Sequence, residues 1–141
     1  MKIAIVQIRG LAAVSGKVKE TMACLNLGSA NNCVVVEDTP SNLGMIKVIK
    51  DFVTFGPISD DFFAKIVAAR GREFLAPTTD RNEKYSKGAF FEFNGKNYHK
   101  CFTLNPPAKG FERKGIKTPF TMGGALGNRG EAIEQLIERM L

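Results

Sequence analysis

Histidine, cysteine and long apolar runs are all scarce in this sequence, and each shortage argues against a class of function. His99 is the only histidine in the 141 residues, so any histidine-based catalytic pair would have to include it. Its neighbours indicate one strand of a hairpin, on which Cys101 would share a face with His99. That pairing is too weak a signal for a thiol nucleophile. The sequence therefore predicts a surface or groove histidine and no catalytic residues.

The three cysteines are odd in number and lack C-x-x-C spacing, which argues against a disulfide framework or a metal site. Cys24 and Cys33 fall inside apolar patterns, so we expect buried small hydrophobic side chains, with no metal and no cofactor. No run reaches the roughly 18 apolar residues that span a bilayer. The chain passes from Met1-Lys2 directly into an alternating pattern, without the apolar core of a signal peptide. We expect a soluble cytoplasmic protein without membrane contact.

Positive charge is what the sequence has in excess. The composition is otherwise ordinary for a globular protein, with 44% hydrophobic and 24% charged residues. A chain of this length buries roughly 68% of its unfolded surface, enough for the core of one domain. The net charge of +6 and the pI near 9.4 favour a polyanionic partner, either nucleic acid or an anionic membrane surface.

The excess charge lies in one segment. Residues 96–129 contain seven basic side chains and one acid, Glu112, and 7 − 1 = +6 is the whole net charge; the other 13 basic and 13 acidic side chains cancel. The basic residues of this segment are Lys96, Lys100, Lys109, Arg113, Lys114, Lys117 and Arg129.

The first half of the chain has the pattern β-α-β-α-β-α. Residues 2–9 are a β-branched run, residues 33–36 form a short apolar run, and residues 53–55 predict a third strand that stops at Gly56-Pro57. This predicts a two-layer α+β unit, a small open sheet with helices packed on one face.

Helix signals separate these strands. Ser15 is a plausible N-cap for a helix over residues 16–27, and Ser59 for a helix that ends at residues 70–71. The helix between them is indicated by the apolar stripe of Met45, Val48, Ile49 and Phe52.

The composition of the sequence changes from residue 77 onward. Residues 78–87 are polar, and residues 90–98 predict a hairpin that turns at Asn94-Gly95. A Gly- and Lys-rich stretch follows, and then a helix from Gly130 that should dock on the body through Ile133, Leu136, Ile137 and Met140. We divide the chain into a core, residues 1–71, and an extension, residues 72–141, within a single structural domain.

Residues 109–120 are the most informative segment, because four basic side chains alternate there with two phenylalanines and two glycines. Lys and Arg neutralise phosphates, glycine permits close backbone approach, and aromatic rings can stack on unpaired bases. A solvated loop fixed to the core by Phe111 and Phe120 is the alternative, and both rings could be core anchors in either case. We favour contact with RNA.

The glycine-rich turn of residues 123–130 precedes the last helix, where free backbone N–H groups could bind an anion. Its spacing is not G-x-x-x-x-G-K-[ST], no clear strand leads into it, and Glu131 would repel a phosphate. The turn is compatible with backbone contact to RNA and argues against a nucleotide site.

Three blocks of sequence agree in order and spacing with a known pattern. They are I-V-Q-I-R-G at residues 5–10; N-N-C-V-V-V-E-D-T-P, G-M and D-F-V-T-F-G within residues 31–56; and L-N-P-P, K-G-F, G-I-K, P-F, G-G, L-G and R-G-E within residues 104–131. Together they resemble the universal L-thirty family of large-subunit ribosomal proteins, in its long archaeal and eukaryotic-type form, called L-seven in eukaryotes. The resemblance covers nearly the whole chain and is weakest between residues 72 and 102.

The resemblance implies a structural constituent of the large ribosomal subunit that binds ribosomal RNA, supports translation and has no enzymatic activity. It implies a single copy in the cytoplasmic ribosome, near the five-S RNA and beside neighbouring ribosomal proteins. For the fold it implies a ferredoxin-like core, with a small antiparallel sheet and helices on one face, and an RNA-binding C-terminal extension.

Charge pattern and matched positions together give the expected RNA-binding residues: Arg9, Lys47, Lys50, Lys109, Phe111, Arg113, Lys114, Lys117 and Arg129. The chain departs from the family at Asn42 and Leu43, where an aromatic and a basic residue are frequent, so we assign no RNA contact there. It also departs at Asn128, where the family often has tyrosine.

Two other functions remain open. A small RNA- or nucleotide-processing enzyme that uses the glycine turn would bind a mononucleotide or turn over a substrate. A ferredoxin-like interaction or ligand-sensing module would oligomerise through its sheet and need no RNA. Neither explains why the whole net charge lies between residues 96 and 129.

Overall fold

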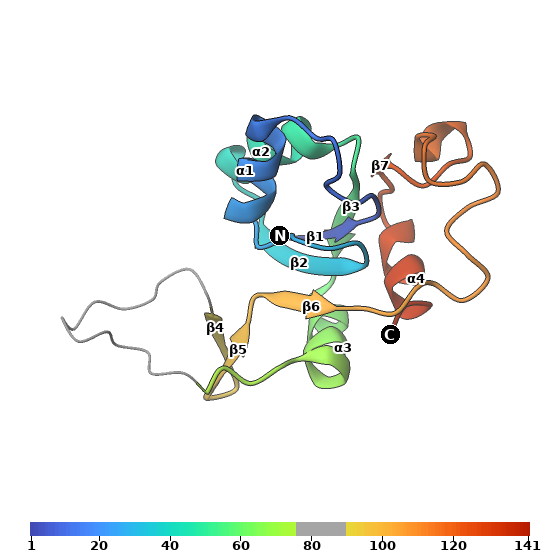
Figure 1. Ribbon diagram of the computed structural model, residues 1–141. Coiled ribbons are helices and arrows are strands. Elements are labelled where there is room, and N and C mark those ends of the chain that lie inside the picture. Colours follow the sequence, from blue (N-terminus) through green and yellow to red (C-terminus); the bar gives the residue numbers. More distant parts are fainter. Residues whose placement is uncertain (76–89) are drawn as a thin grey trace.

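The computed structural model describes residues 1–75 and 90–141, which contain a five-stranded sheet and a separate two-stranded hairpin (Figure 1). The sheet has the strand order β6-β2-β1-β3-β7, in which only the β3–β7 pair is parallel. The predicted polar stretch, residues 78–87, lies outside the described residues. The strands of the sheet are β1 (Lys2–Gln7), β2 (Asn32–Glu37), β3 (Val53–Ile58), β6 (Cys101–Thr103) and β7 (Gly127–Asn128).

The first and third helices begin where the sequence predicted, whereas the last begins at Ala132, two residues after the predicted Gly130. The Thr39 and Ser59 hydroxyls accept hydrogen bonds from the backbone N–H groups of Asn42 and Phe62, both at 3.3 Å, and so cap the second and third helices. Ser15 holds the N-cap position of the first helix without such a bond. The described α-helices are α1 (Gly16–Cys24), α2 (Pro40–Ile49), α3 (Asp60–Arg70) and α4 (Ala132–Glu138).

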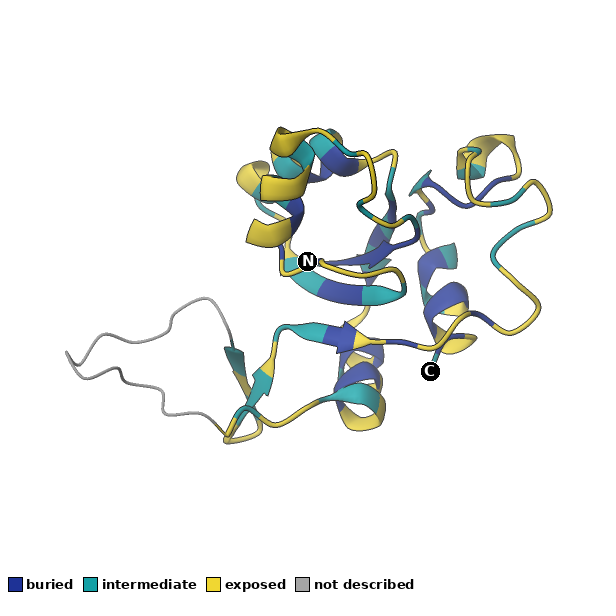
Figure 2. Ribbon diagram, in the orientation of Figure 1, coloured by how far each residue is buried: buried dark blue, intermediate teal, exposed yellow. Residues whose placement is uncertain are grey.

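Strand β1 lies at the centre of the sheet and is buried on both faces. Ile3 and Ile5 pack with α1 and α2, whereas Ala4 and Val6 pack in a second cluster with α3 and α4. Figure 2 shows the central strands in dark blue, between helices whose outer sides are yellow. The predicted α+β class is confirmed.

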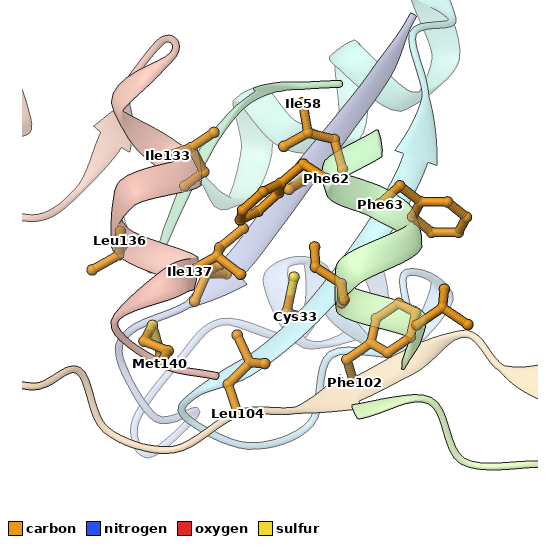
Figure 3. Packing of buried hydrophobic residues seen from close by; sticks show 14 residues of the cluster. Cys33, Ile58, Phe62, Phe63, Phe102, Leu104, Ile133, Leu136, Ile137 and Met140 are labelled. Carbon is orange, nitrogen blue, oxygen red and sulfur yellow. The ribbon is translucent and has the colours of Figure 1, made fainter. Parts of the chain in front are cut away.

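The expectation of helices on one face holds for α1 and α2 but not for α3 and α4, which cover the opposite face. The physical reason is the composition of β1, whose run is apolar at successive positions and so needs cover on both sides. Figure 3 shows the second cluster, in which Phe62 of α3 and Ile137 of α4 meet over the sheet. The predicted docking of the last helix is confirmed.

Strand β3 continues through Gly56-Pro57 to Ile58, so the predicted stop at these residues is wrong. The Phe55 carbonyl faces β7, since it accepts a hydrogen bond from the Arg129 N–H. Pro57, two residues on, therefore points its nitrogen to the same side, beyond the last β7 pair at Phe55. A proline is tolerated there because its missing N–H removes no hydrogen bond to β1.

The hairpin of β4 (Phe90–Phe93) and β5 (Lys96–His99) turns at Asn94 and Gly95, as predicted, and both have positive φ angles of 51° and 76°. Its Phe91, Phe93 and Tyr98 pack against the cluster of α3 and α4. The extension also supplies β6, β7 and α4 to the sheet and core. The division at residue 71 stays a prediction.

The cysteines divide by position. Cys33 is fully buried on β2, as expected, but the expectation is wrong for Cys24, which is exposed at the end of α1. Within residues 1–75 and 90–141, no helix combines the length and apolar character that a membrane crossing requires.

The substitution Gly56→Ala should destabilise the fold. A Cβ atom at residue 56 would lie 2.3 Å from the Gly130 carbonyl oxygen and 3.0 Å from Cγ2 of Ile133, so α4 would have to move. We expect a loss of about 1–3 kcal/mol in the free energy of unfolding, measured in urea. The control Gly44→Ala, on α2 with no atom within 4 Å of the new Cβ, should gain up to about 1 kcal/mol. Equal effects of both substitutions would contradict this packing.

Thiol labelling should follow burial. Burial raises the pKa of the Cys33 thiol and that of the half-buried Cys101 thiol. Because the thiolate is the reactive form, the native protein should expose Cys24 to an aromatic disulfide reagent at once and protect Cys33 until it unfolds. Mass spectrometry of the labelled peptides with and without urea measures the order, and rapid native labelling of Cys33 would refute it.

Candidate RNA-binding surface

The basic segment is held in a compact loop by its own backbone. Ala125 N donates to Thr118 O at 2.9 Å, Phe120 N donates to Leu126 O at 2.8 Å, and a 3-10 turn spans Phe120–Met122. At Gly124 a Cβ atom would lie 2.0 Å from the Thr118 carbonyl oxygen, so only glycine fits this close approach. The loop therefore presents its side chains from a defined scaffold.

Arg129 fastens this loop to the sheet. Its side chain is only 2% exposed, and its Nη1 donates to Oε1 of Glu112 at 2.5 Å. Its Nε lies 3.4 Å from Oγ1 of Thr54 on β3, and its guanidinium stands 4.5 Å from the centroid of the Phe120 ring. A charge buried in this way requires a partner, and Glu112 supplies it.

Arg129 is not available for the RNA contact that the sequence predicted, because its guanidinium is buried and paired with Glu112. The sequence shows the positive charge of Arg129 but does not indicate that Glu112, 17 residues away, is its partner. Glu112 also lies 3.7 Å from Arg139 Nη2. The single acid of the basic segment is thus neutralised internally, which leaves the exposed cations Lys109, Arg113, Lys114 and Lys117 without an acidic neighbour inside that segment.

Three predicted residues from three separate segments line one groove of about 540 Å³. Arg9 follows β1, Lys50 follows α2, and Lys117 belongs to the basic loop. The other lining residues are Asp51, Phe52, Pro119, Leu126 and Gly127. The groove joins the core to the extension with positively charged walls.

Arg9 is held in place at the groove. Its Nη1 lies 3.4 Å from the Asp51 carbonyl oxygen, which accepts a hydrogen bond, and its guanidinium stands 5.3 Å from the centroid of the Phe52 ring. Sequence reasoning missed Phe52 as a lining residue, because its spacing assigned it to the apolar stripe of the second helix. That helix ends at Ile49, and Phe52 lies half-buried in the turn before β3.

The other predicted residues differ in accessibility. Lys47 is exposed on α2, three residues before Lys50 and so near it on the helix surface. Lys109 is exposed in the loop with φ of 66°. Phe111 is half-buried and packs against the core clusters, which supports its alternative role as an anchor.

The structure gives little support to a His99–Cys101 pair, to an anion site at the glycine turn or to a metal site. His99 ends β5 of the hairpin whereas Cys101 begins β6 of the large sheet, so the two do not share a strand face as expected. The Gly130 N–H of the glycine turn already donates to Oδ1 of Asn128 at 2.9 Å. Among residues 1–75 and 90–141, no three His, Cys, Asp or Glu side chains are grouped to hold a metal ion.

The chain is a small, basic α+β protein whose cations are gathered around a groove with an aromatic side chain in its wall, an arrangement typical of the nucleic-acid-binding class. Comparison with known proteins specifies the class further. A family described as "Ribosomal protein L30p/L7e" matches residues 3–53.

The relatives match over the whole chain. The "Large ribosomal subunit protein uL30" of Methanopyrus kandleri is 39% identical, over 95% of this chain and 100% of its own length. The proteins of the same name from Methanococcus maripaludis and Methanocella arvoryzae are 36% and 37% identical, over 100% and 97% of this chain and 100% and 98% of their own lengths. The chain belongs to the ribosomal protein L30p/L7e family.

The substitution Glu112→Gln should destabilise the protein by leaving the Arg129 guanidinium buried without a counter-charge. We expect a loss of about 1–3 kcal/mol, less than for a fully buried pair because the Glu112 side chain is 29% exposed. The measurement is urea unfolding, with proteolysis of the loop as a second readout.

The matched control is Glu131→Gln, the same chemical change at an exposed acid that forms no ion pair with the described residues. It should alter the free energy of unfolding by about 0.5 kcal/mol or less. If Glu112→Gln has no larger effect than this control, Arg129 does not fasten the loop.

Proposed function

We propose that this protein is a structural constituent of the large ribosomal subunit and binds ribosomal RNA through the groove and the adjoining basic loop. The contacting residues are Arg9, Lys47, Lys50, Lys109, Arg113, Lys114 and Lys117. Phosphate contacts supply most of the affinity, and the fixed arrangement of the cations selects the shape of the RNA. Membership of a ribosomal protein family agrees with a structural role in translation and not with an enzyme.

One observation carries this proposal, namely the meeting of Arg9, Lys50 and Lys117 in a single groove. Like charges repel each other, so a fold gains nothing by gathering them on its own. An RNA backbone would supply the missing negative charge and release its counterions on binding. The relatives, each called a large ribosomal subunit protein, indicate which RNA that is.

The resemblance of this chain to the long form of the family supports a position of the protein near the five-S RNA. It also supports one copy in each cytoplasmic ribosome, with other ribosomal proteins as neighbours. Both faces of the described sheet are covered by helices, which argues against the alternative of oligomerisation through an open sheet face.

Binding to large-subunit ribosomal RNA should depend steeply on salt, and the double substitution Lys50→Ala/Lys117→Ala should weaken it. Each lost phosphate contact makes the negative slope of log K against log salt less steep by about 0.7–0.9. The loss of both lysines should therefore reduce the steepness by up to about two units. Titrations at several salt concentrations measure both the affinity and the slope.

The matched control is Lys17→Ala/Lys19→Ala, which removes two exposed lysines from α1 and leaves the groove intact. It should bind the RNA like the unchanged protein. If the groove variant and the control behave alike, or if the unchanged protein does not bind the RNA, the proposed interface is wrong.

A further inference from the structure

The groove has an apolar side that phosphate binding does not explain. Beside its cations it is lined by Phe52, Pro119 and Leu126. Phosphates are bound by charged and polar side chains and by backbone N–H groups, and they gain nothing from contact with a proline ring or an apolar side chain. A ligand that fits this groove has an apolar, planar part next to a negative charge.

The guanidinium of Arg9 lies over the ring of Phe52, and this stacked pair is the platform of the groove. The guanidinium of Arg9 stands 5.3 Å from the centroid of the Phe52 ring, and its bond to the Asp51 carbonyl keeps it there. Unpaired bases stack on aromatic rings and on guanidinium planes. Because the platform exists before binding, little side-chain entropy is lost when a base stacks on it.

The charges around the platform suit a single phosphate group. Lys50, which follows α2, and Lys117 of the basic loop both line the groove. The carboxylate of Asp51 lines it as well. With Arg9 the lining charge is three positive against one negative, a net +2. Gly127, at a φ of 83°, brings bare backbone to the wall and leaves room for a ligand.

We propose that the groove binds one unpaired ribonucleotide of the RNA, with its base on the Arg9–Phe52 platform and its phosphate between Lys50 and Lys117. The groove volume of about 540 Å³ lies within the range of roughly 300–1,000 Å³ for small-molecule sites. This inference rests on the proposed RNA-binding function and specifies its ligand. Read-out of an extruded nucleotide would add to the shape selection supplied by the surrounding cations.

The test compares two short RNA duplexes of the same sequence, one fully paired and one with a single bulged 2-aminopurine nucleotide. The full-length protein should bind the bulged RNA at least about fivefold more tightly, as one base stacked on a side chain predicts. Fluorescence of the bulged base should change on binding, because stacking alters its emission.

Two substitutions locate the base. Arg9→Lys keeps the charge but loses the planar group, so it should weaken binding of the bulged RNA more than binding of the paired RNA. Phe52→Leu should act in the same direction, and circular dichroism checks that it folds. Arg9→Lys, at a half-buried surface residue, decides the question should Phe52→Leu fail to fold. The control Arg72→Lys, at an exposed arginine outside the groove, should retain the preference for the bulge.

Equal affinity of the unchanged protein for the two duplexes, or an unaltered preference in Arg9→Lys, would overturn the nucleotide site. Salt-dependent binding to ribosomal RNA would survive either result, so the proposed function would stand. Absence of that binding would instead contradict the proposed function, and this inference with it.

Discussion

The buried guanidinium of Arg129 is the interaction on which the arrangement of the extension depends. It joins Glu112 and Phe120 of the basic loop to Thr54 of β3, so that one side chain holds two stretches of the loop against the sheet. Thr54 adds a second link, because its hydroxyl donates to the Gly127 carbonyl at 3.1 Å. Loss of the Glu112 contact would leave this charge without its partner, at a cost of about 1–3 kcal/mol. The exposed lysines of the loop and Arg113 are therefore held at fixed positions relative to the core.

The two ends of the sheet differ in charge. Because β1 is antiparallel to β2 and β3, the start of β1 lies beside the ends of both neighbours. Glu37, Asp38 and Asp60 gather around that end, where a hydrogen bond and ion pair with Lys2 lower the pKa of Asp60. Arg9 follows the opposite end of β1, in the basic groove. The acidic side chains near the start of β1 and the basic groove near its end give the molecule an uneven charge distribution along the sheet.

Local signals predicted most elements of this fold, because caps and turns act over a few residues. Ser59 and the Asn94-Gly95 turn are examples. The Ser59 hydroxyl caps the helix that follows it, and the positive φ angles of Asn94 and Gly95 form the turn of the hairpin. Features set by tertiary packing were missed. The exposure of Cys24 and the position of α3 and α4 on the second face depend on which elements meet, and apolar periodicity alone does not give this. The burial of Arg129 was missed for the same reason: the sequence shows its charge, but only the folded chain brings Glu112 to it.

The groove, by contrast, is a direct product of the sheet register. Pairing of Gln7 with Val53 places the end of β1 beside the turn before β3, and the N–H groups of Ile8 and Arg9 both donate to the Phe52 carbonyl, at 3.0 and 3.1 Å. Pairing of Thr54 with Gly127 then brings the basic loop to the same place. A shift of one residue in either ladder would turn the side chains of that strand to the other face. The burial of Ile5 and Val53 in one core cluster opposes such a shift of β1 against β3, so the hydrophobic core fixes the position of Arg9 on Phe52.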